Sequence, residues 1–191
     1  RLDNSSFYLA NSEISNNNYG INFKIVSNSI IENNNFNNNN EGTSTSAGTE
    51  NYGVGSFTYC KILSNNFFDN VYSGFSFGGY RNNANNNEIK NNISRNNGGA
   101  GFNFSWGDVV RGFADNLIEG NIIYKNGGHG ILVGRDNNTI KKNIIINNGS
   151  SGIGISGTYI SEGLTIENNI FSGNINYKID LSSNTNTTVR Y

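Results

Sequence analysis

Two stretches of the chain repeat each other without a gap and decide the fold. Residues 116–133 read NLIEGNIIYKNGGHGILV, and residues 138–155 read NTIKKNIIINNGSSGIGI. Repetition at a fixed period, here about 22 residues, is typical of solenoids, in which each repeat forms one turn. The matched pairs are Ile118 with Ile140, Asn121 with Asn143, Ile123 with Ile145, Gly130 with Gly152, and Val133 with Ile155.

The same pattern extends in both directions and predicts seven copies. In the third copy the alignment assigns Leu63 and Phe68 to the apolar positions. In the second copy it places a long insertion before Gly53 and Val54, which take the last glycine and apolar positions of the template. The anchor residues are unevenly spaced, so residues are inserted between some copies. They are Ser12, Asn34, Asn66, Asn92, Asn121, Asn143 and Asn169.

Each copy carries the period of β-strands. Apolar residues alternate with polar or small ones over three or four positions, as in Phe102-Asn103-Phe104, and no stretch sustains a helical period. Three short strands separated by Asn and Gly turns make one coil of a parallel β-helix. Because one coil cannot bury its inward face alone, stacked coils must complete the core. We therefore predict an all-β solenoid of about seven coils, with Ile118 and Ile140 stacked inside.

The composition agrees with stacked coils and excludes several functions. The chain has 191 residues, with 42 Asn, 24 Gly and no Pro. Asparagine suits the corners because it tolerates left-handed backbone and can bond along a ladder of equivalent residues. The formal net charge of −1 argues against nucleic acid as a partner. Cys60 and His129 are each the sole residue of their type, so no metal or cofactor is expected. No apolar run is long enough for membrane insertion.

Residues inserted between coils carry the candidate binding residues. The segment 41–51 has the small, polar composition of a flexible loop, while 78–87 and 105–114 follow the third strands of adjacent coils and should emerge close together. Aromatic rings in these segments would stack on sugars, and arginines would meet carboxylates or sulfates. The alternative is that Trp106 and Phe113 pack the loop onto the solenoid while the arginines are solvated. The predicted groove residues are Tyr80, Arg81, Trp106, Asp108, Arg111 and Arg135.

The repeats resemble right-handed parallel β-helix repeats of the pectate-lyase-like superfamily, and most closely the catalytic module of secreted mannuronan C-5 epimerases. The resemblance is carried by NNISRNNGGAGFNF (91–104), GNIIYKNGGHGILV (120–133) and KNIIINNGSSGIGI (142–155). It implies a right-handed single-stranded β-helix and an active-site role for His129. The family's Tyr-Gly-Phe-Asp-Pro-His stretch corresponds to Ser73–Gly78, its aspartate to Ala100 and its arginine to Gly128, so most of the catalytic motif is missing.

Three functions follow from these observations. The first is an extracellular or cell-surface β-helix that binds a uronate-type polysaccharide in a groove on one face. The second is a structural adhesin or fibre segment that associates end to end through uncapped coils. This reading treats residues 1–191 as a single domain, cut from a longer chain or stacked on other chains. The third is an active polysaccharide lyase or uronate C-5 epimerase using His129.

Overall fold

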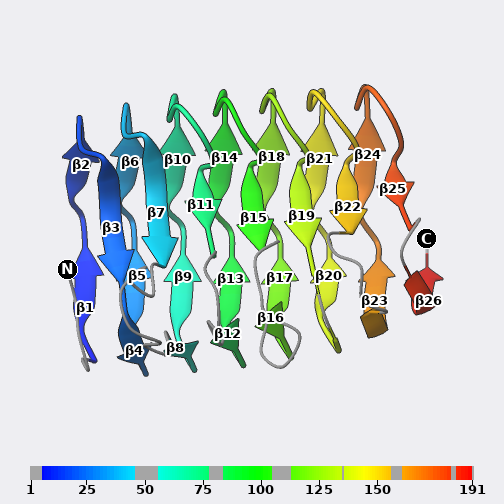
Figure 1. The fold of residues 1–191 in the computed structure, drawn as a ribbon, viewed down its shortest axis with the longest axis horizontal. Coiled ribbons are helices and arrows are strands. Elements are labelled where there is room, and N and C mark those ends of the chain that lie inside the picture. Colours follow the sequence, from blue (N-terminus) through cyan, green and yellow to red (C-terminus); the bar gives the residue numbers. More distant parts are fainter. Residues whose placement is uncertain are drawn as a thin grey trace, which may run out of the picture.

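The computed structural model describes residues 6–45, 56–77, 84–104, 113–134, 136–155, 161–181 and 184–190. Within these ranges every regular element is a β-strand, and the strands pair in parallel into three long sheets. Figure 1 shows the strands of each sheet side by side along the longest axis, with the coils following one another in chain order. These ranges contain no helix that could cross a membrane. The predicted all-β solenoid is confirmed.

We number the sheets in the order in which the chain enters them. Sheet 1 contains β1 (Tyr8–Ala10), β5 (Ile30–Glu32), β9 (Lys61–Leu63), β13 (Glu88–Lys90), β17 (Leu117–Glu119), β20 (Thr139–Lys141), β23 (Ser161–Glu167) and β26 (Asn184–Arg190). Sheet 2 contains β2 (Glu13–Ser15), β6 (Asn35–Asn37), β10 (Asn66–Phe68), β14 (Ile93–Arg95), β18 (Ile122–Tyr124), β21 (Ile144–Ile146) and β24 (Ile170–Ser172). Sheet 3 contains β3 (Tyr19–Phe23), β7 (Glu41–Thr45), β11 (Phe75–Ser76), β15 (Phe102–Phe104), β19 (Ile131–Val133), β22 (Ile153–Ile155) and β25 (Ile179–Asp180). Two short pairs complete the set, β4 (Ile25–Ser27) with β8 (Ser56–Thr58) and β12 (Ala84–Asn85) with β16 (Phe113–Ala114).

The core consists of inward side chains from all three sheets, which recur at equivalent positions in successive coils. Ile118 and Ile140 are directly paired and both are 0% exposed, as predicted. Burying one such side chain contributes about 1.5–3 kcal/mol, so the stacked rows supply most of the driving force for folding. The row of sheet 1 is Leu9, Ile31, Ile62, Ile89, Ile118, Ile140 and Ile166. The row of sheet 3 is Ile21, Thr43, Phe75, Phe102, Ile131, Ile153 and Ile179.

At each corner between sheets, two consecutive residues have different structural roles. The first residue is left-handed, such as Asn91 with φ 57°. The second is buried and forms a ladder with its equivalents: Asn92 donates from Nδ2 to the Ile62 carbonyl at 2.9 Å and to Asn121 Oδ1 at 3.0 Å. Sequence reasoning assigned both properties to the corner asparagines without separating them, and this division explains the frequent Asn-Asn pairs.

Two ladders run through the two corners that adjoin sheet 2, and a shorter one lies at the third corner. The ladder between sheets 1 and 2 is Ser12, Asn34, Asn65, Asn92, Asn121, Asn143 and Asn169. The ladder between sheets 2 and 3 is Asn17, Asn39, Asn70, Asn97, Asn126, Asn148 and Asn174. Between sheet 3 and the next sheet 1 strand, Asn87, Asn116 and Asn138 continue a row that begins with Ser29 and Cys60.

The third copy is shifted by one residue from the predicted alignment. Asn65, not Asn66, occupies the ladder, and its Nδ2 donates to Asn92 Oδ1 at 3.1 Å. Ile62 and Phe67 point inward in place of the assigned Leu63 and Phe68. The sequence reads Ser-Asn-Asn at this corner, so either asparagine fits the template. The inward pairing of Ile62 with Ile89 decides between them.

The second copy differs in the position of its insertion. Glu41–Thr45 was expected to begin a flexible loop, but it forms β7 and pairs with β3 and β11. Gly42 therefore takes the position assigned to Gly53, because the amide of Gly42 donates to the Ser73 carbonyl at 3.1 Å, as that of Gly74 does to Ala100. The long connection follows the third strand instead of preceding it. Gly53 and Val54 lie outside the described residues.

Candidate functional site

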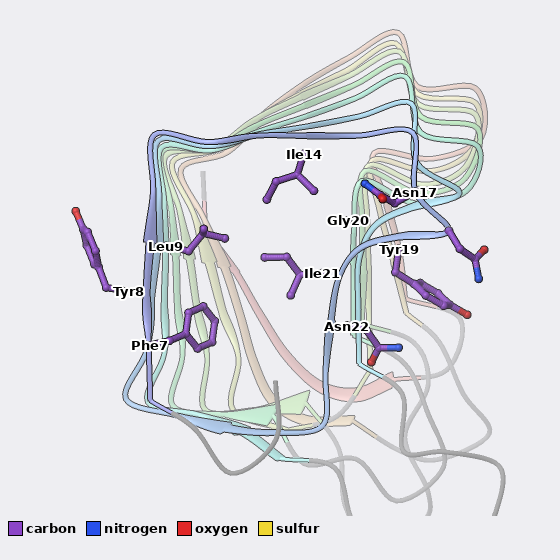
Figure 2. Close-up of a pocket in the computed structure, with 10 residues that line it drawn as sticks. Phe7, Tyr8, Leu9, Ile14, Asn17, Tyr19, Gly20, Ile21 and Asn22 are labelled. Carbon is purple, nitrogen blue, oxygen red and sulfur yellow. The ribbon is translucent and has the colours of Figure 1, made fainter. Parts of the chain in front are cut away.

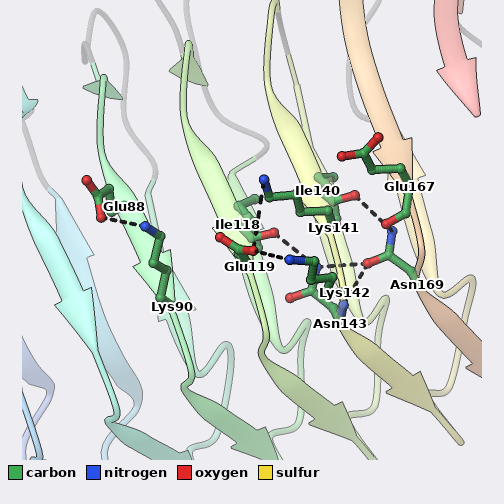
Figure 3. A network of polar contacts seen from close by, with 10 residues as sticks. All are labelled: Glu88, Lys90, Ile118, Glu119, Ile140, Lys141, Lys142, Asn143, Glu167 and Asn169. Carbon is green, nitrogen blue, oxygen red and sulfur yellow. Dashed lines mark hydrogen bonds and ion pairs between the residues drawn. The ribbon is translucent and has the colours of Figure 1, made fainter. Parts of the chain in front are cut away.

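The three outer faces of the solenoid differ in chemistry, and this difference locates the candidate site. Sheet 1 presents an outward row in which charges alternate from coil to coil. Lys141 Nζ lies 3.9 Å and Lys142 Nζ 3.2 Å from Glu119 Oε1, so this face neutralises itself (Figure 3). The alternating row is Lys90, Glu119, Lys141, Glu167 and Arg190.

Sheet 3 presents short polar side chains over most of its outward row. Ser44 and Ser76 of this row are buried, whereas Asn22 and Asn103 are partly exposed and could hydrogen-bond a hydroxyl-rich ligand. At its N-terminal part Glu41 bonds to Ser44 and Ser76, and burial raises the pKa of the Glu41 carboxyl. The outward row is Asn22, Ser44, Ser76, Asn103, Leu132, Gly154 and Asp180.

His129 lies on this polar face, at the end of the turn that leads into β19. Its ring is half-buried, and Nε2 lies 3.5 Å from Ser150 Oγ, at the outer limit of a hydrogen bond. Nδ1 is buried and has no hydrogen-bond partner within the described ranges. The hydroxyl of Ser151, which follows His129 in the next coil, is likewise buried and unpartnered there.

Gly154 explains how the imidazole can lie flat on the sheet. A Cβ on Gly154 would come within 2.5 Å of His129 Nδ1 and 2.7 Å of Cε1. Such contacts are far inside van der Waals distance, so any other residue at this position would displace the ring. In the outward row of sheet 3, glycine occurs at the one position that the sole histidine covers.

Asp180 is the next outward residue after Gly154 along the row. Burial lowers the pKa of His129, and the negative charge of Asp180 opposes this effect without cancelling it. The imidazole is therefore neutral at pH 7, with one nitrogen able to accept and the other to donate a proton. The arrangement can bind a hydroxyl or act as a weak base.

The other predicted site residues, Tyr80, Arg81, Trp106, Asp108, Arg111 and Arg135, lie outside the described residues. The structure does describe the ends of the connections that carry five of them. The amide of Phe77 donates to the Asn103 carbonyl at 2.7 Å, and Ala84 pairs with Phe113. The rings of Phe104 and Phe113 stack at 3.9 Å. The described residues on either side of 78–83 and 105–112 therefore lie in adjacent coils at the end of sheet 3, as the sequence indicated.

Two further features of the described residues carry no site. An open hollow of about 720 Å³ lies at the first coil. Leu9, Ile14 and Ile21 point into it (Figure 2). These side chains continue the inward rows, so the hollow is the inner side of that coil. Burial raises the pKa of the Cys60 thiol to about 11, which keeps it un-ionised at pH 7. Among the described side chains, no three His, Cys, Asp or Glu residues gather as metal ligands.

Comparison with known proteins agrees with this architecture. Residues 104–190 match the family model described as the right handed beta helix region. The chain is a right-handed parallel β-helix. A comparison with curated proteins found no match.

Solved structures resemble this β-helix at low sequence identity. The A-module of the Azotobacter vinelandii mannuronan C-5 epimerase AlgE4 is 18% identical with a TM-score of 0.70, covering 96% of this chain and 57% of that chain. The periplasmic alginate epimerase AlgG is 16% identical with a TM-score of 0.57, covering 96% and 47%. The Streptococcus pneumoniae surface protein and adhesin PfbA is 18% identical with a TM-score of 0.50, covering 87% and 50%. The β-helix thus spans about half the length of these proteins, and the likeness shows a shared fold.

Sequence reasoning found His129 but missed Gly154, Asp180 and Ser150. The missing signal was the coil offset applied to outward residues. Leu132 closely follows His129 in the same coil, and the offset that pairs the core residues leads from Leu132 to Gly154. In the last coil, the offset that pairs Ile153 with Ile179 leads likewise from Gly154 to Asp180.

Proposed function

We propose that this β-helix binds a uronate-type polysaccharide on the outer face of sheet 3, beside the connections that carry Trp106 and Arg111. The observation that carries the proposal is the half-buried His129 ring, laid on Gly154 with Asp180 next in the row. Apart from Leu132, the outward residues around the ring are short, namely Asn103, Gly154 and Asp180, whereas sheet 1 carries alternating charges and sheet 2 is largely apolar.

The likeness to epimerases supports the choice of ligand. Two similar structures are named for mannuronan and alginate, which are polyuronates. A uronate carboxylate calls for a cation, and Arg81, Arg111 and Arg135 belong to the connections at the edge of sheet 3. Trp106 and Tyr80 would stack on the sugar rings. Two similar structures are described as periplasmic or as a surface protein, which supports a secreted or cell-surface location.

Binding is favoured over catalysis because the acid–base set is incomplete. Proton abstraction beside a carboxylate needs a base, an acid and a charge clamp within mutual reach. Glu41 lies three coils from His129, about 14 Å at the spacing of paired strands. Ala100 occupies the coil before His129 at the position where the epimerases carry an aspartate. The alternative, an active lyase or epimerase, would require groups from the segments 78–83 and 105–112.

Affinity electrophoresis in gels containing alginate, pectate or neutral dextran tests the proposal. We expect the wild-type protein to be retarded by polyuronate and not by dextran. Trp106→Ala should abolish the retardation, and Arg111→Gln should weaken binding at least about tenfold. Lys142→Gln is the matched control, since it removes one exposed cation from another face. Unretarded wild-type protein on every polyuronate would overturn the proposal.

Catalysis is tested separately on the same polymers. The protein is incubated with alginate, pectate and chondroitin, and ultraviolet absorbance reports new unsaturated ends. Proton NMR of the alginate reports any change in C-5 configuration. Product that forms with wild type and disappears in His129→Gln would establish the lyase or epimerase alternative.

A structural role as an adhesin or fibre segment is the second candidate function. It is supported by the likeness to the adhesin PfbA. End-to-end association of coils stays a prediction of this candidate. Electron microscopy of the purified protein tests it, since filaments would support it and uniform single particles would contradict it.

A further inference from the structure

The hydroxyl of Ser150 lies beside the imidazole of His129. The two residues belong to the turns that lead from sheet 2 into β22 and β19, and Ser150 Oγ lies 3.5 Å from His129 Nε2. Asn176, in the equivalent turn of the following coil, donates from Nδ2 to Ser150 Oγ at 3.2 Å. A hydroxyl, an imidazole and an amide donor from three successive coils therefore meet at the edge of sheet 3.

Ser150 and His129 have the chemistry of a nucleophile and its base. A serine hydroxyl becomes a strong nucleophile when an imidazole nitrogen accepts its proton, and the two atoms of such pairs lie about 2.6–3.2 Å apart, often further without substrate. Burial lowers the pKa of His129, so the ring is neutral at pH 7. Nε2 can then accept the proton of Ser150 while Nδ1 carries the ring's own proton.

Asp180 favours the imidazolium that such a step produces. Burial opposes the protonated ring, whereas the negative charge of Asp180 and the backbone of Ser151 raise the pKa of His129. In Ser-His-Asp hydrolases the aspartate stabilises the imidazolium in this way without taking the proton itself. Asp180 acts through His129 and is therefore a positioning residue.

The equivalents of Ser150 in the two preceding coils are glycines. The amide of Ser150 donates to the Gly128 carbonyl at 3.0 Å, and that of Gly128 to the Gly99 carbonyl at 2.8 Å. A Cβ on Gly128 would lie 3.0 Å from the carbonyl carbon of Gly99, so stacking of the coils crowds out a side chain there. Ser150 is partly exposed and Asn176 is exposed. A substrate can therefore reach the hydroxyl over bare backbone.

We propose that Ser150 and His129 form a nucleophile–base pair that hydrolyses O-acyl esters on the hydroxyl groups of a polysaccharide. The polymer is taken from the proposed function, whereas the ester chemistry is inferred from these side chains alone. Ester hydrolysis needs no cation to hold a uronate carboxylate. Its negative charge develops on the former carbonyl oxygen, to which Asn176 Nδ2 can donate.

The reaction passes through an acyl group on Ser150. Ser150 Oγ attacks the ester carbon while its proton moves to His129 Nε2, and the sugar oxygen takes that proton as its bond to the carbon breaks. A water molecule then attacks the acyl group and gives its proton to His129. Ser150 Oγ leaves with this proton. Ester and water thus become a sugar hydroxyl and a carboxylic acid.

Hydrolysis of p-nitrophenyl acetate tests the pair without any polysaccharide. We expect the wild type to release p-nitrophenolate, and Ser150→Ala and His129→Gln each to lower the rate at least about a hundredfold. Ser172→Ala is the matched control, since it removes an exposed hydroxyl from the outer face of sheet 2 and should keep the wild-type rate. Circular dichroism shows whether each variant is folded.

A fluorophosphonate probe tests the nucleophile directly. Peptide mass spectrometry should find the probe on Ser150 in the wild type and not in His129→Gln. Asp180→Asn should still react, but the rising limb of its pH–rate profile should move to lower pH, because loss of the negative charge lowers the pKa of His129. A merely structural role of Asp180 would leave the profile in place.

Ester-bearing polymers separate this proposal from glycan binding. Acetate released from O-acetylated alginate by the wild type and not by Ser150→Ala would support it, whereas methanol released from methyl-esterified pectin without any acetate would overturn the O-acyl assignment. A Ser150 that stays unmodified by the probe overturns the proposal even where alginate retards the protein, and this outcome does not depend on any variant folding. Modified Ser150 and ester hydrolysis without retention on polyuronate would support the pair and contradict the proposed ligand.

Discussion

The corner between sheets 1 and 2 and the corner between sheet 3 and the next sheet 1 strand follow opposite rules. At the first corner two residues separate the strands in every coil, as in Asn91-Asn92 and Gly120-Asn121. At the second, the step from one inward residue to the next varies in length, from the short step between Ile131 and Ile140 to the long one between Thr43 and Ile62.

This contrast indicates where the fold accommodates added residues. An asparagine ladder requires its members at the same height and angle in each coil, so one added residue would break bonds to both neighbouring coils. We call the corner between sheet 3 and the next sheet 1 strand the variable corner. Its asparagine ladder includes only Asn87, Asn116 and Asn138, so the chain can leave the solenoid and return there. Variation at that corner places new side chains beside sheet 3, where His129 lies.

An insertion should separate the two corners most strongly. Adding Gly-Ser between Asn121 and Ile122 should lower the free energy of unfolding by more than about 5 kcal/mol, enough to prevent folding. The same dipeptide between Arg135 and Asp136 should cost about 0.6 kcal/mol or less, since lengthening a loop costs little. Urea unfolding followed by circular dichroism measures both. Equal tolerance at the two sites would show that the ladder does not set the corner.

Removing one ladder side chain should have the next largest effect. Asn121→Ala deletes the bonds from Nδ2 to the Ile89 carbonyl and to Asn143 Oδ1, and it leaves the amide of Asn92 without its acceptor. We expect a loss of about 3–5 kcal/mol in urea unfolding. Asn91→Gly is the control from the same corner, and it should change stability by less than about 1 kcal/mol because glycine accepts its left-handed φ. A similar loss in both variants would contradict the separate roles of the left-handed residue and the ladder residue.

Extending the third ladder should stabilise the protein. Cys60 occupies a ladder position, where its amide donates to Asn87 Oδ1 at 2.9 Å. Asn87 Nδ2 donates to the Phe57 carbonyl at 2.9 Å, and Val26 is the residue paired with Phe57 one coil earlier. In Cys60→Asn the new Nδ2 would therefore donate to the Val26 carbonyl. We expect a gain of about 1 kcal/mol, measured by urea unfolding, with Cys60→Ala as the control. Destabilisation by asparagine would show that this corner cannot hold a ladder there.

The smallest effect concerns the polar face beside the variable corner. Because the pKa of His129 is lowered in the folded protein, the unfolded chain binds the proton more readily. Its contribution to stability is complete above the ordinary pKa of 6.5 and is lost as the pH falls through the lowered value. The melting temperature of the wild type should therefore fall more between pH 7.5 and 5.5 than that of His129→Gln. Parallel curves would mean that burial does not perturb the ring.

The sequence predicted the repeats better than their exact register. Ile118, Ile140 and their partners were placed correctly because an ungapped match between two whole coils leaves no choice. Asn65 and Asn66 could not be distinguished, since adjacent asparagines both suit a corner and only the pairing of Ile62 selects one. The strand Glu41–Thr45 was missed because its inward residue is Thr43, a polar side chain in an otherwise apolar row.

The residues around His129 could not be predicted from the local sequence either. His129 could be singled out as the sole histidine, but its importance depends on what lies under the ring. Gly154 and Asp180 are one and two coils further along the chain and meet His129 only after the coils are stacked.

The amino-acid sequence by itself determined that this protein is a solenoid, because a repeating inward face can be buried only by stacking. It also determined that the corners are built from asparagine. The tertiary structure alone decided which of two adjacent asparagines forms each ladder, which face became polar, charged or apolar, and which residues surround His129. Those properties arise between coils, where contacts depend on registers that differ by a single residue and that local sequence does not specify.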